Sequence, residues 1–443
     1  MTTLTEKWAK VLDLEGSPKI LDEHRRAVTA QLLENEVQFL KSSAEHDAGF
    51  FTALQEDYAP ANHGGDGLAL GQGGTNARMM GYDPVLINLV RRAMPQLIAF
   101  DVCGVQPMTM PTGLIFALKA RYGNQQGKEA LYGEADTAFS GAKTPTHKGS
   151  NWADGTDYTT GTGMTTEDKE KLGGDVAWNE MAFSIERTQV VAQARALKAE
   201  YTMELAQDLK AVHGLDASTE LSNILATEIL AEINREVIRN IYTTAVTGCA
   251  NGTATKGVFD LDIDSDGRWS AEKYKSLMMR IEREANAIAQ DTRRGRGNFI
   301  ICSSDVASAL QMAGMLDYAP ALQQNQLNVD EATNTFAGIL NGKYKVFIDP
   351  YTANQAQDQY FVMGYKGNSP YDAGMFYCPY IPLQLVKAQD PNTFQPKIGF
   401  QTRYGIAFNP MVQLDANLGN GTVTAAQMAG KNYYYRKVAI KNL

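Results

Sequence analysis

The stretch RRAMPQLIAFDVCGVQPMTMPTGLIFALKARYG, residues 91–123, decides the fold of this chain, and its second half has the period of a β-strand. Side chains alternate there with a period of two, which places Phe116, Leu118, Ala120 and Tyr122 on one face. A second extended segment is predicted at residues 183–191. Residues 124–178 between them are rich in Gly, Thr, Asp and Lys and too long for an ordinary loop. We expect a small surface module or a mobile flap there.

Helical patterns dominate the next part of the chain. Residues 203–212 predict a helix that ends at His213-Gly214, because this glycine can turn the chain. A longer helix of about six turns is predicted over 219–242, where apolar residues recur mostly three and four apart. Another helix is predicted at 271–288. Short strands are predicted at 299–301, 345–348, 360–363, 402–408 and 433–440. Because helices and strands are interleaved but partly segregated, the predicted fold class is α+β.

The first 56 residues form a segment of their own, with a net charge of −4. From Ser17-Pro18 onward, apolar residues recur at helical intervals, which predicts an amphipathic helix with Pro18 near its first turn. Such a helix needs a surface to pack against, so a partner is implied. Beyond Glu56 the character changes abruptly: residues 57–85 are rich in glycine and are expected to form a flexible arm.

The composition excludes several classes of protein. With 443 residues, 44% of them hydrophobic, the chain can bury a large core over more than one domain. Its net charge of −9 lacks the positive excess that tight, sequence-independent binding to nucleic acid requires. Four widely spaced cysteines without CxxC spacing predict reduced, buried thiols. Neither an export signal nor an apolar run of about 18 residues is visible, so we expect a soluble cytoplasmic chain and no membrane span.

One acidic cluster could bind a metal ion. Asp262, Asp264 and Asp266 fit the first half of a calcium loop, and neighbouring carboxylates repel one another unless a cation or solvent neutralises them. The bidentate Glu required at position twelve is replaced by Lys273, which rules out the full motif. The alternative is an acidic turn ahead of the helix that starts near Trp269.

Other motifs for chemistry are scarce. The glycines at 71–74 lack the features of a nucleotide-binding loop, so no cofactor is expected. The five histidines have no His or Cys at metal spacing, which makes a zinc site improbable. Residues 293–297, RRGRG, are the one basic cluster, and a solvated loop or a salt bridge at a subunit contact is favoured there over a nucleic-acid contact. No catalytic residue is predicted, and the chain is not expected to be an enzyme.

Residues 91–123 resemble the start of the mature major capsid protein of T-even-type tailed phages. The resemblance covers most of the chain, in order, and includes LKAEYTMELAQDLKAVHGLD (197–216), ELSNILATEILAEINREVI (220–238) and FQPKIGFQTRYGIAFNP (394–410). It implies the Hong Kong 97 capsid fold.

Carried over by order, the resemblance implies six regions. They are a scaffold-facing propeptide (1–56), an N-terminal arm (57–95), an extended loop (96–200) with an insertion region (124–178), a peripheral domain with a long spine helix (201–254), an axial domain (255–385) and C-terminal strands of the peripheral domain (386–443). The insertion is shorter than the family's and scarcely similar to it, which puts docking of decoration proteins there in doubt.

The resemblance also implies a processing site. Members of this family lose an N-terminal propeptide when a prohead protease cuts after Glu in an Ile/Leu-x-Glu motif. Leu54-Gln55-Glu56 stands where that cut would fall, so the mature subunit is expected to begin at Asp57. A junction between helix and coil offers the extended residues that a protease needs. The same pattern begins at Leu4, Leu21, Leu32 and Leu230, and the alternative is that Leu and Glu are simply common in helices.

The function implied is assembly of this chain with itself into hexameric capsomers of an icosahedral or prolate phage head. The head would enclose double-stranded DNA without binding it specifically. Implied partners are a scaffold, the prohead protease, a vertex capsid protein, the portal and, where a phage has them, decoration proteins. Three alternatives remain: a pentameric vertex paralogue, an encapsulin-like cellular shell protein, and a calcium-dependent enzyme that uses the Asp262 cluster.

Overall fold

The computed structural model confirms the predicted α+β class. It describes residues 4–12, 22–46, 97–131, 135–142, 146, 148–149, 158–174, 177–250, 253–265, 269–313, 316–318, 335–349, 359–390, 393, 395–409 and 425–443. Within these ranges, no helix has the length and apolar character needed to cross a membrane.

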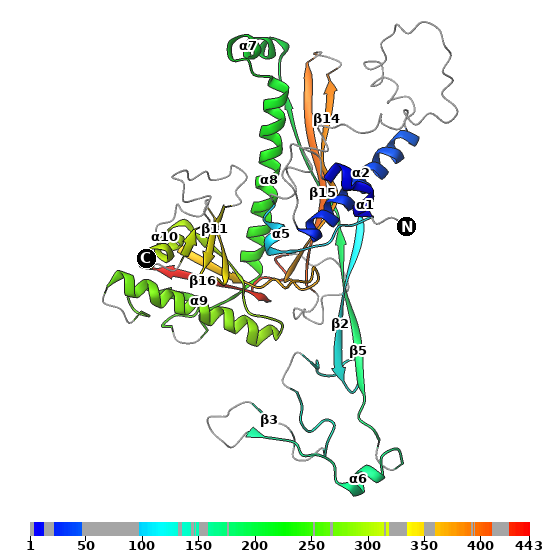
Figure 1. The fold of residues 1–443 in the computed structure, drawn as a ribbon, viewed down its shortest axis with the longest axis vertical. Helices are drawn as coiled ribbons and strands as arrows, with labels where there is room; N and C mark the ends of the chain where they lie inside the picture. The colour runs from blue at the N-terminus through cyan, green and yellow to red at the C-terminus, as the bar shows by residue number, and fades with distance from the viewer. Residues whose placement is uncertain are drawn as a thin grey trace.

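A long two-stranded ribbon projects from the rest of the molecule (Figure 1). Strands β2 (Thr112–Tyr122) and β5 (Met181–Val191) pair antiparallel along their whole length, from Thr112 opposite Val191 to Tyr122 opposite Met181. Both strands were predicted. The described part of the insertion between them contains β3 (Lys148–Gly149), β4 (Tyr158–Thr159) and α6 (Thr166–Glu170), which agrees with a small surface module at the far end of the ribbon.

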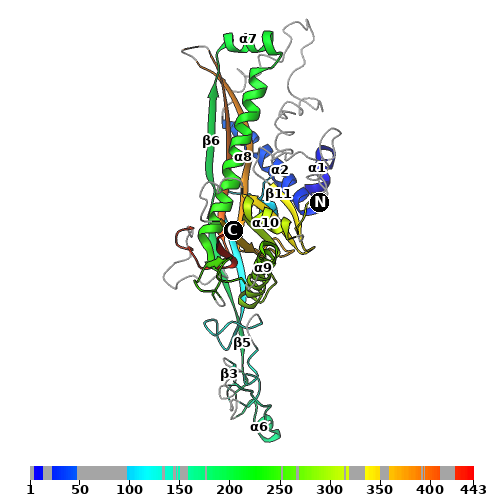
Figure 2. The same cartoon turned by 90° about the vertical axis from the view of Figure 1, so that its left-hand side faces the viewer.

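The central part of the molecule is a long helix lying along a sheet (Figure 2). Helix α7 (Met203–His213) ends as predicted, with Gly214 in the left-handed conformation at φ +68°. Helix α8 (Ala217–Thr244) follows and packs on β6 (Gln193–Glu200) and β15 (Pro396–Phe408). The sheet order is β1 (Gly104–Val105), β14 (Met375–Gln389), β15, β6. Most of the apolar stripe predicted for α8 is buried, including Ile229, Ile233, Val237 and Ile241.

A second sheet forms the adjoining domain. Its order is β10 (Leu316–Tyr318), β11 (Thr335–Leu340), β12 (Tyr344–Asp349), β9 (Phe299–Ser303), β13 (Gln359–Gly364), β16 (Asn432–Lys441) and β7 (Ala245–Thr247), and β8 (Val258–Asp260) also pairs with β16. Helices α9 (Ser270–Thr292) and α10 (Ser304–Met312) pack against this sheet. The predicted boundary after residue 385 does not follow the sheets, because the C-terminal β16 pairs with β13.

A buried polar cluster joins the long helix to the second sheet. The carboxylate of Asp349 in β12 is fully buried and accepts hydrogen bonds from Arg235 (2.6 Å), Tyr242 (2.8 Å) and Tyr360 (2.8 Å). Arg235 and Tyr242 belong to α8, whereas Tyr360 belongs to β13. A charge in the interior is stable only when it is paired and hydrogen-bonded, so this cluster fixes the helix against the sheet.

The N-terminal segment forms helices α1 (Leu4–Leu12), α2 (Glu23–His46) and, further along, α5 (Ala99–Val102). A helix is present where an amphipathic one was predicted, but its described part begins at Glu23, and Pro18 lies outside the described residues. Asp22 explains the start, because its side chain accepts a hydrogen bond from the backbone N–H of His24 at 3.0 Å. Within the described residues, α2 packs against β14 of its own chain, and the scaffold partner implied for this helix stays a prediction.

Candidate subunit interface

One face of the ribbon presents large apolar side chains to solvent. Phe116 and Leu118 on β2 are 58% and 62% exposed, and Phe183 and Ile185 on β5 are each 61% exposed. The pairing register places these residues on the same face, with Leu118 opposite Ile185. We call this surface the ribbon face; it consists of Leu114, Phe116, Leu118, Met181, Phe183 and Ile185.

The opposite face is apolar and buried near the root of the ribbon, at Ile115 and Val190, and polar further out, where its charges are matched internally. Glu186 forms an ion pair with Lys119 at 2.8 Å and another with Arg121 at 2.9 Å. Arg121 also donates to the hydroxyl of Ser184 at 2.7 Å. Cross-strand pairs of this kind stabilise a ribbon and hold its register. The polar face is therefore satisfied within one chain, whereas the ribbon face is not covered.

An isolated two-stranded ribbon is marginally stable in water, because it lacks a second layer on its apolar side. Complete burial of a large apolar side chain contributes about 1.5–3 kcal/mol, and each of these half-exposed side chains forgoes part of that free energy while it stays in water. An exposed apolar patch of this kind, here interrupted by Arg187 opposite Phe116, is typical of an interaction surface. The ribbon face is therefore the strongest candidate for an interface in the described part of the chain.

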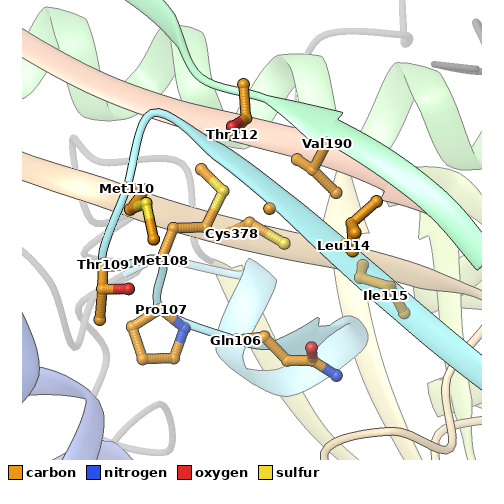
Figure 3. Close-up of a pocket in the computed structure, with 11 residues that line it drawn as sticks. Gln106, Pro107, Met108, Thr109, Met110, Thr112, Leu114, Ile115, Val190 and Cys378 are labelled. Carbon is orange, nitrogen blue, oxygen red and sulfur yellow. The ribbon is translucent and has the colours of Figure 1, made fainter.

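A small cavity lies at the root of the ribbon (Figure 3). Its volume is about 190 Å³, and it lies between the loop of residues 106–110, the start of β2, Val190 of β5 and Cys378 of β14. Met108 and Met110 supply much of its wall, and methionine adapts to irregular gaps because its side chain is flexible. None of the lining residues is charged, so the cavity offers no acid–base pair for catalysis.

The predicted calcium residues lie in an acidic turn. The amides of Ala254 and Asp260 donate to the two oxygens of Asp264, at 2.9 and 3.0 Å. Asp262 pairs with Lys273, the residue that replaces the expected Glu, at 2.5 Å. Asp266 lies outside the described residues, and the described ranges contain no group of three side chains that could hold a metal ion. In this geometry Lys273 supplies the positive charge next to Asp262.

The basic cluster and the four cysteines make contacts within the chain or are buried in it. Arg294 pairs with Asp372 at 3.5 Å and Arg296 pairs with Glu282, so two of the three arginines of the basic cluster have acidic partners within the chain. All four cysteines are buried, as predicted, and burial raises the pKa of Cys103 to about 12. The processing site Leu54-Gln55-Glu56-Asp57 and the arm at 57–95 lie outside the described residues.

Sequence reasoning identified both strands of the ribbon but missed that its apolar face is open. The signal was present in both strands, because Met181, Phe183 and Ile185 alternate with the smaller or polar residues 182, 184 and 186. Alternation shows which side chains share a face. It does not show whether the same chain covers that face.

Comparison with known proteins identifies the family. The protein family described as "Major capsid protein Gp23" matches residues 79–440 of this chain. The major capsid protein of Enterobacteria phage T4 is 37% identical over 99% of this chain and 98% of its own length. The capsid vertex protein of the same phage is more distant, at 27% identity over 52% of this chain and 53% of its own length. Among solved structures, the capsid of Myoviridae phage XM1 matches with a TM-score of 0.41 and 9% identity, covering 77% of this chain and 91% of that one.

The sequence match extends over the ribbon, the long helix and both sheets, and it is stronger to a major capsid protein than to a vertex protein. The chain belongs to the Gp23 family of phage major capsid proteins, which are structural proteins of the virion shell and not enzymes.

Proposed function

We propose that this chain assembles with copies of itself into hexameric capsomers of an icosahedral or prolate head that encloses double-stranded DNA. The observation that carries this proposal is the ribbon face, a set of exposed apolar side chains on a projecting ribbon of a shell protein. In a lattice of identical chains, the surface that covers it belongs to a neighbouring copy. Many modest contacts of this kind add to a stable shell, while each contact remains reversible during assembly.

The proposed arrangement follows the Hong Kong 97 plan. The ribbon with its insertion is the extended loop, and α8 with the β1-β14-β15-β6 sheet is the peripheral domain. The sheet that contains β9, β13 and β16 is the axial domain. This division assigns β16 to the axial domain because of its pairing with β13.

The proposed maturation step is removal of residues 1–56 by a prohead protease that cuts between Glu56 and Asp57. Cleavage is irreversible, so it can make an expanded lattice the state of lower free energy. It also removes a segment of net charge −4 from a chain of −9, which leaves −5. An acidic lining adheres weakly to DNA and allows it to move during packaging and ejection.

The proposed partners are other copies of this chain, an internal scaffold, the protease, a vertex capsid protein and the portal. The insertion departs from the family pattern, which argues against docking of decoration proteins on it. An encapsulin-like cellular shell would have no propeptide cut, so retention of residues 1–56 in mature particles would favour it. A calcium-dependent enzyme would require an activity that Asp264→Asn removes.

Intact-mass measurement of this chain from purified mature virions tests the maturation step. A mass that corresponds to a start at Asp57 is expected. The full-length mass in infectious particles would contradict the proposed cut. Native mass measurement of the assembling chain tests the hexamer, and pentamers as the dominant ring would favour the vertex paralogue.

A further inference from the structure

We propose that the leader, residues 4–12 and 22–46, is a ligand docked in a built site on its own subunit, and that it stays bound after the connecting chain is cut. Its departure is then a separate dissociation step. The contacts between the leader and the rest of the chain do not depend on where the connecting chain is cut.

A polar clamp holds the middle of α2. The side-chain amide of Asn35 donates to the backbone carbonyl of Met108 at 2.7 Å and to that of Tyr380 at 3.0 Å. The oxygen of the same amide accepts a hydrogen bond from Gln31 at 3.0 Å. Asn35 is only 5% exposed, so water cannot replace these bonds while the leader is docked. One buried side chain therefore joins the leader to two separate segments of the subunit.

An ion pair holds the beginning of α2. Arg25 contacts Asp101 of α5 at 2.6 Å, and its guanidinium lies 5.5 Å from the centre of the Phe100 ring. Lys366 donates to the carbonyl oxygen of Phe100 on the same short segment. The leader therefore contacts α5 through Arg25, and the body contacts the same short helix through Lys366.

Apolar side chains of the leader complete the main core. Trp8, Leu12, Val28, Ala30, Leu32 and Leu33 are each at most 4% exposed, and they belong to the same cluster of buried residues as Leu97, Ile98, Phe100 and Val102. Burial on this scale is typical of a folded domain and exceeds what a loosely tethered segment shows. A break in the connecting chain removes none of these contacts.

The docking site lies at the root of the ribbon. Met108, whose carbonyl oxygen accepts a hydrogen bond from Asn35, also lines the cavity beside β2 (Figure 3), and Tyr380 belongs to β14. The backbone amide of Met108 donates to the carbonyl of Pro379 at 2.9 Å, so the loop is held from both sides. Release of the leader breaks the hydrogen bond between Asn35 and Met108, and the bond to Pro379 then remains on the segment that leads into β2. The leader thus restrains the ribbon as well as covering part of the core.

The test uses the full chain with a recognition sequence for a specific protease inserted between residues 50 and 51. After the cut, size-exclusion chromatography under native conditions measures how much leader stays with the subunit. A labelled synthetic peptide of residues 4–46 is then offered in exchange, with the subunit left unchanged. Peptides with Asn35→Ala and, as a matched control, Gln38→Ala are compared; Gln38 is an exposed amide on the same helix.

We expect the cut leader to co-elute with the subunit and to be replaced by the wild-type peptide. Asn35→Ala should weaken the peptide by about 10- to 100-fold, because two buried hydrogen bonds are lost, and Gln38→Ala by less than about twofold. Immediate separate elution of the cut leader would overturn the proposal, as would equal exchange by the Asn35→Ala and Gln38→Ala peptides. No phage protease is used, so this result is independent of whether virions carry a chain that begins at Asp57.

Discussion

The leader and the ribbon carry similar apolar side chains but use them in opposite ways. Leu32 of the leader is fully buried against its own chain, whereas Phe116 and Leu118 of the ribbon are 58% and 62% exposed. The leader therefore completes the subunit, whereas we propose that a second copy covers the ribbon face. A substitution in the ribbon face should affect assembly and spare the fold, whereas a substitution in the interior should affect the fold first.

The largest effect is expected in the ribbon face. Phe116→Asp combined with Phe183→Asp places two charges on a surface that must be desolvated for another copy to bind it. We expect loss of particles at concentrations at which the wild type assembles, with a thermal midpoint close to that of the unassembled wild-type chain. Sedimentation velocity and electron microscopy measure the first quantity, and circular dichroism measures the second.

The matched control is Phe116→Leu with Phe183→Leu, which keeps the ribbon face apolar. These chains should form particles. Normal particles from the double Asp variant would show that the ribbon face is not an interface.

A substitution in the interior is expected to lower the stability of the unassembled chain. Asp349→Ala removes the buried carboxylate that pairs with Arg235 and accepts hydrogen bonds from Tyr242 and Tyr360. Removing one member of a buried pair costs about 3–5 kcal/mol of unfolding free energy. Urea denaturation of the unassembled chain measures this loss. Asp208→Ala on the exposed surface of α7 is the control and should change stability by less than about 0.5 kcal/mol.

A loss below about 1 kcal/mol for Asp349→Ala would show that this cluster does not hold α8 against the second sheet. The claim that substitutions in the interior act mainly on the stability of the fold would then be contradicted for this cluster.

Docking of the leader should also be detectable by limited proteolysis with a Glu-specific endoprotease, as a difference in cutting rate between two sites. Glu23 is exposed at the start of α2, whereas Glu34 follows the buried Leu32 and Leu33 and is bound by Lys7 (2.6 Å) and Trp8 (3.1 Å). Cutting after Glu34 requires local opening, so we expect it to be at least about tenfold slower than cutting after Glu23. Mass spectrometry of the early fragments measures the two rates. Equal rates would mean that α2 is not held on the subunit.

The repeated Leu-x-Glu pattern shows what the sequence could and could not establish here. It marks Leu32-Leu33-Glu34 as readily as Leu54-Gln55-Glu56, because the letters carry no information on burial. The predicted helix of the leader was found, but its start at Glu23 depends on the side chain of Asp22, and its packing on β14 depends on contacts between residues far apart in the chain.

Elements set by local pattern were predicted well, and those set by distant pairing were not. The periodicity over 219–242 and the glycine at 214 were enough to predict α8 and the end of α7. The pairing of β16 with β13 joins segments about seventy residues apart, and nothing local in either strand signals it. The exposure of the ribbon face was missed for the same reason, since it depends on what the rest of the chain leaves uncovered.

The smallest effect concerns the pH dependence of stability. Burial raises the pKa of Glu282, but hydrogen bonds from Tyr344 and Arg296 outweigh it and hold that pKa below the ordinary value of 4.5. Ionised Glu282 therefore stabilises the fold above that ordinary value, and this contribution is lost as the pH falls through the lower folded-state pKa. Because this carboxylate is partly exposed, the effect should stay below about 1 kcal/mol.

Urea midpoints of the wild type and Glu282→Gln, measured at several pH values, test this expectation. The difference should be present at pH 7 and should disappear at strongly acidic pH. A difference that grows as the pH falls would contradict the assigned direction.

The most direct measurement is the reactivity of a thiol placed in the ribbon face. Leu118→Cys introduces an exposed thiol into a chain whose four natural cysteines are all buried, so a maleimide reagent should modify the new residue selectively. Rapid labelling in unassembled chains and at least tenfold slower labelling in assembled particles are expected, because a neighbouring copy covers this face. Equal labelling rates in the two states would contradict the claim that the ribbon face is where subunits join.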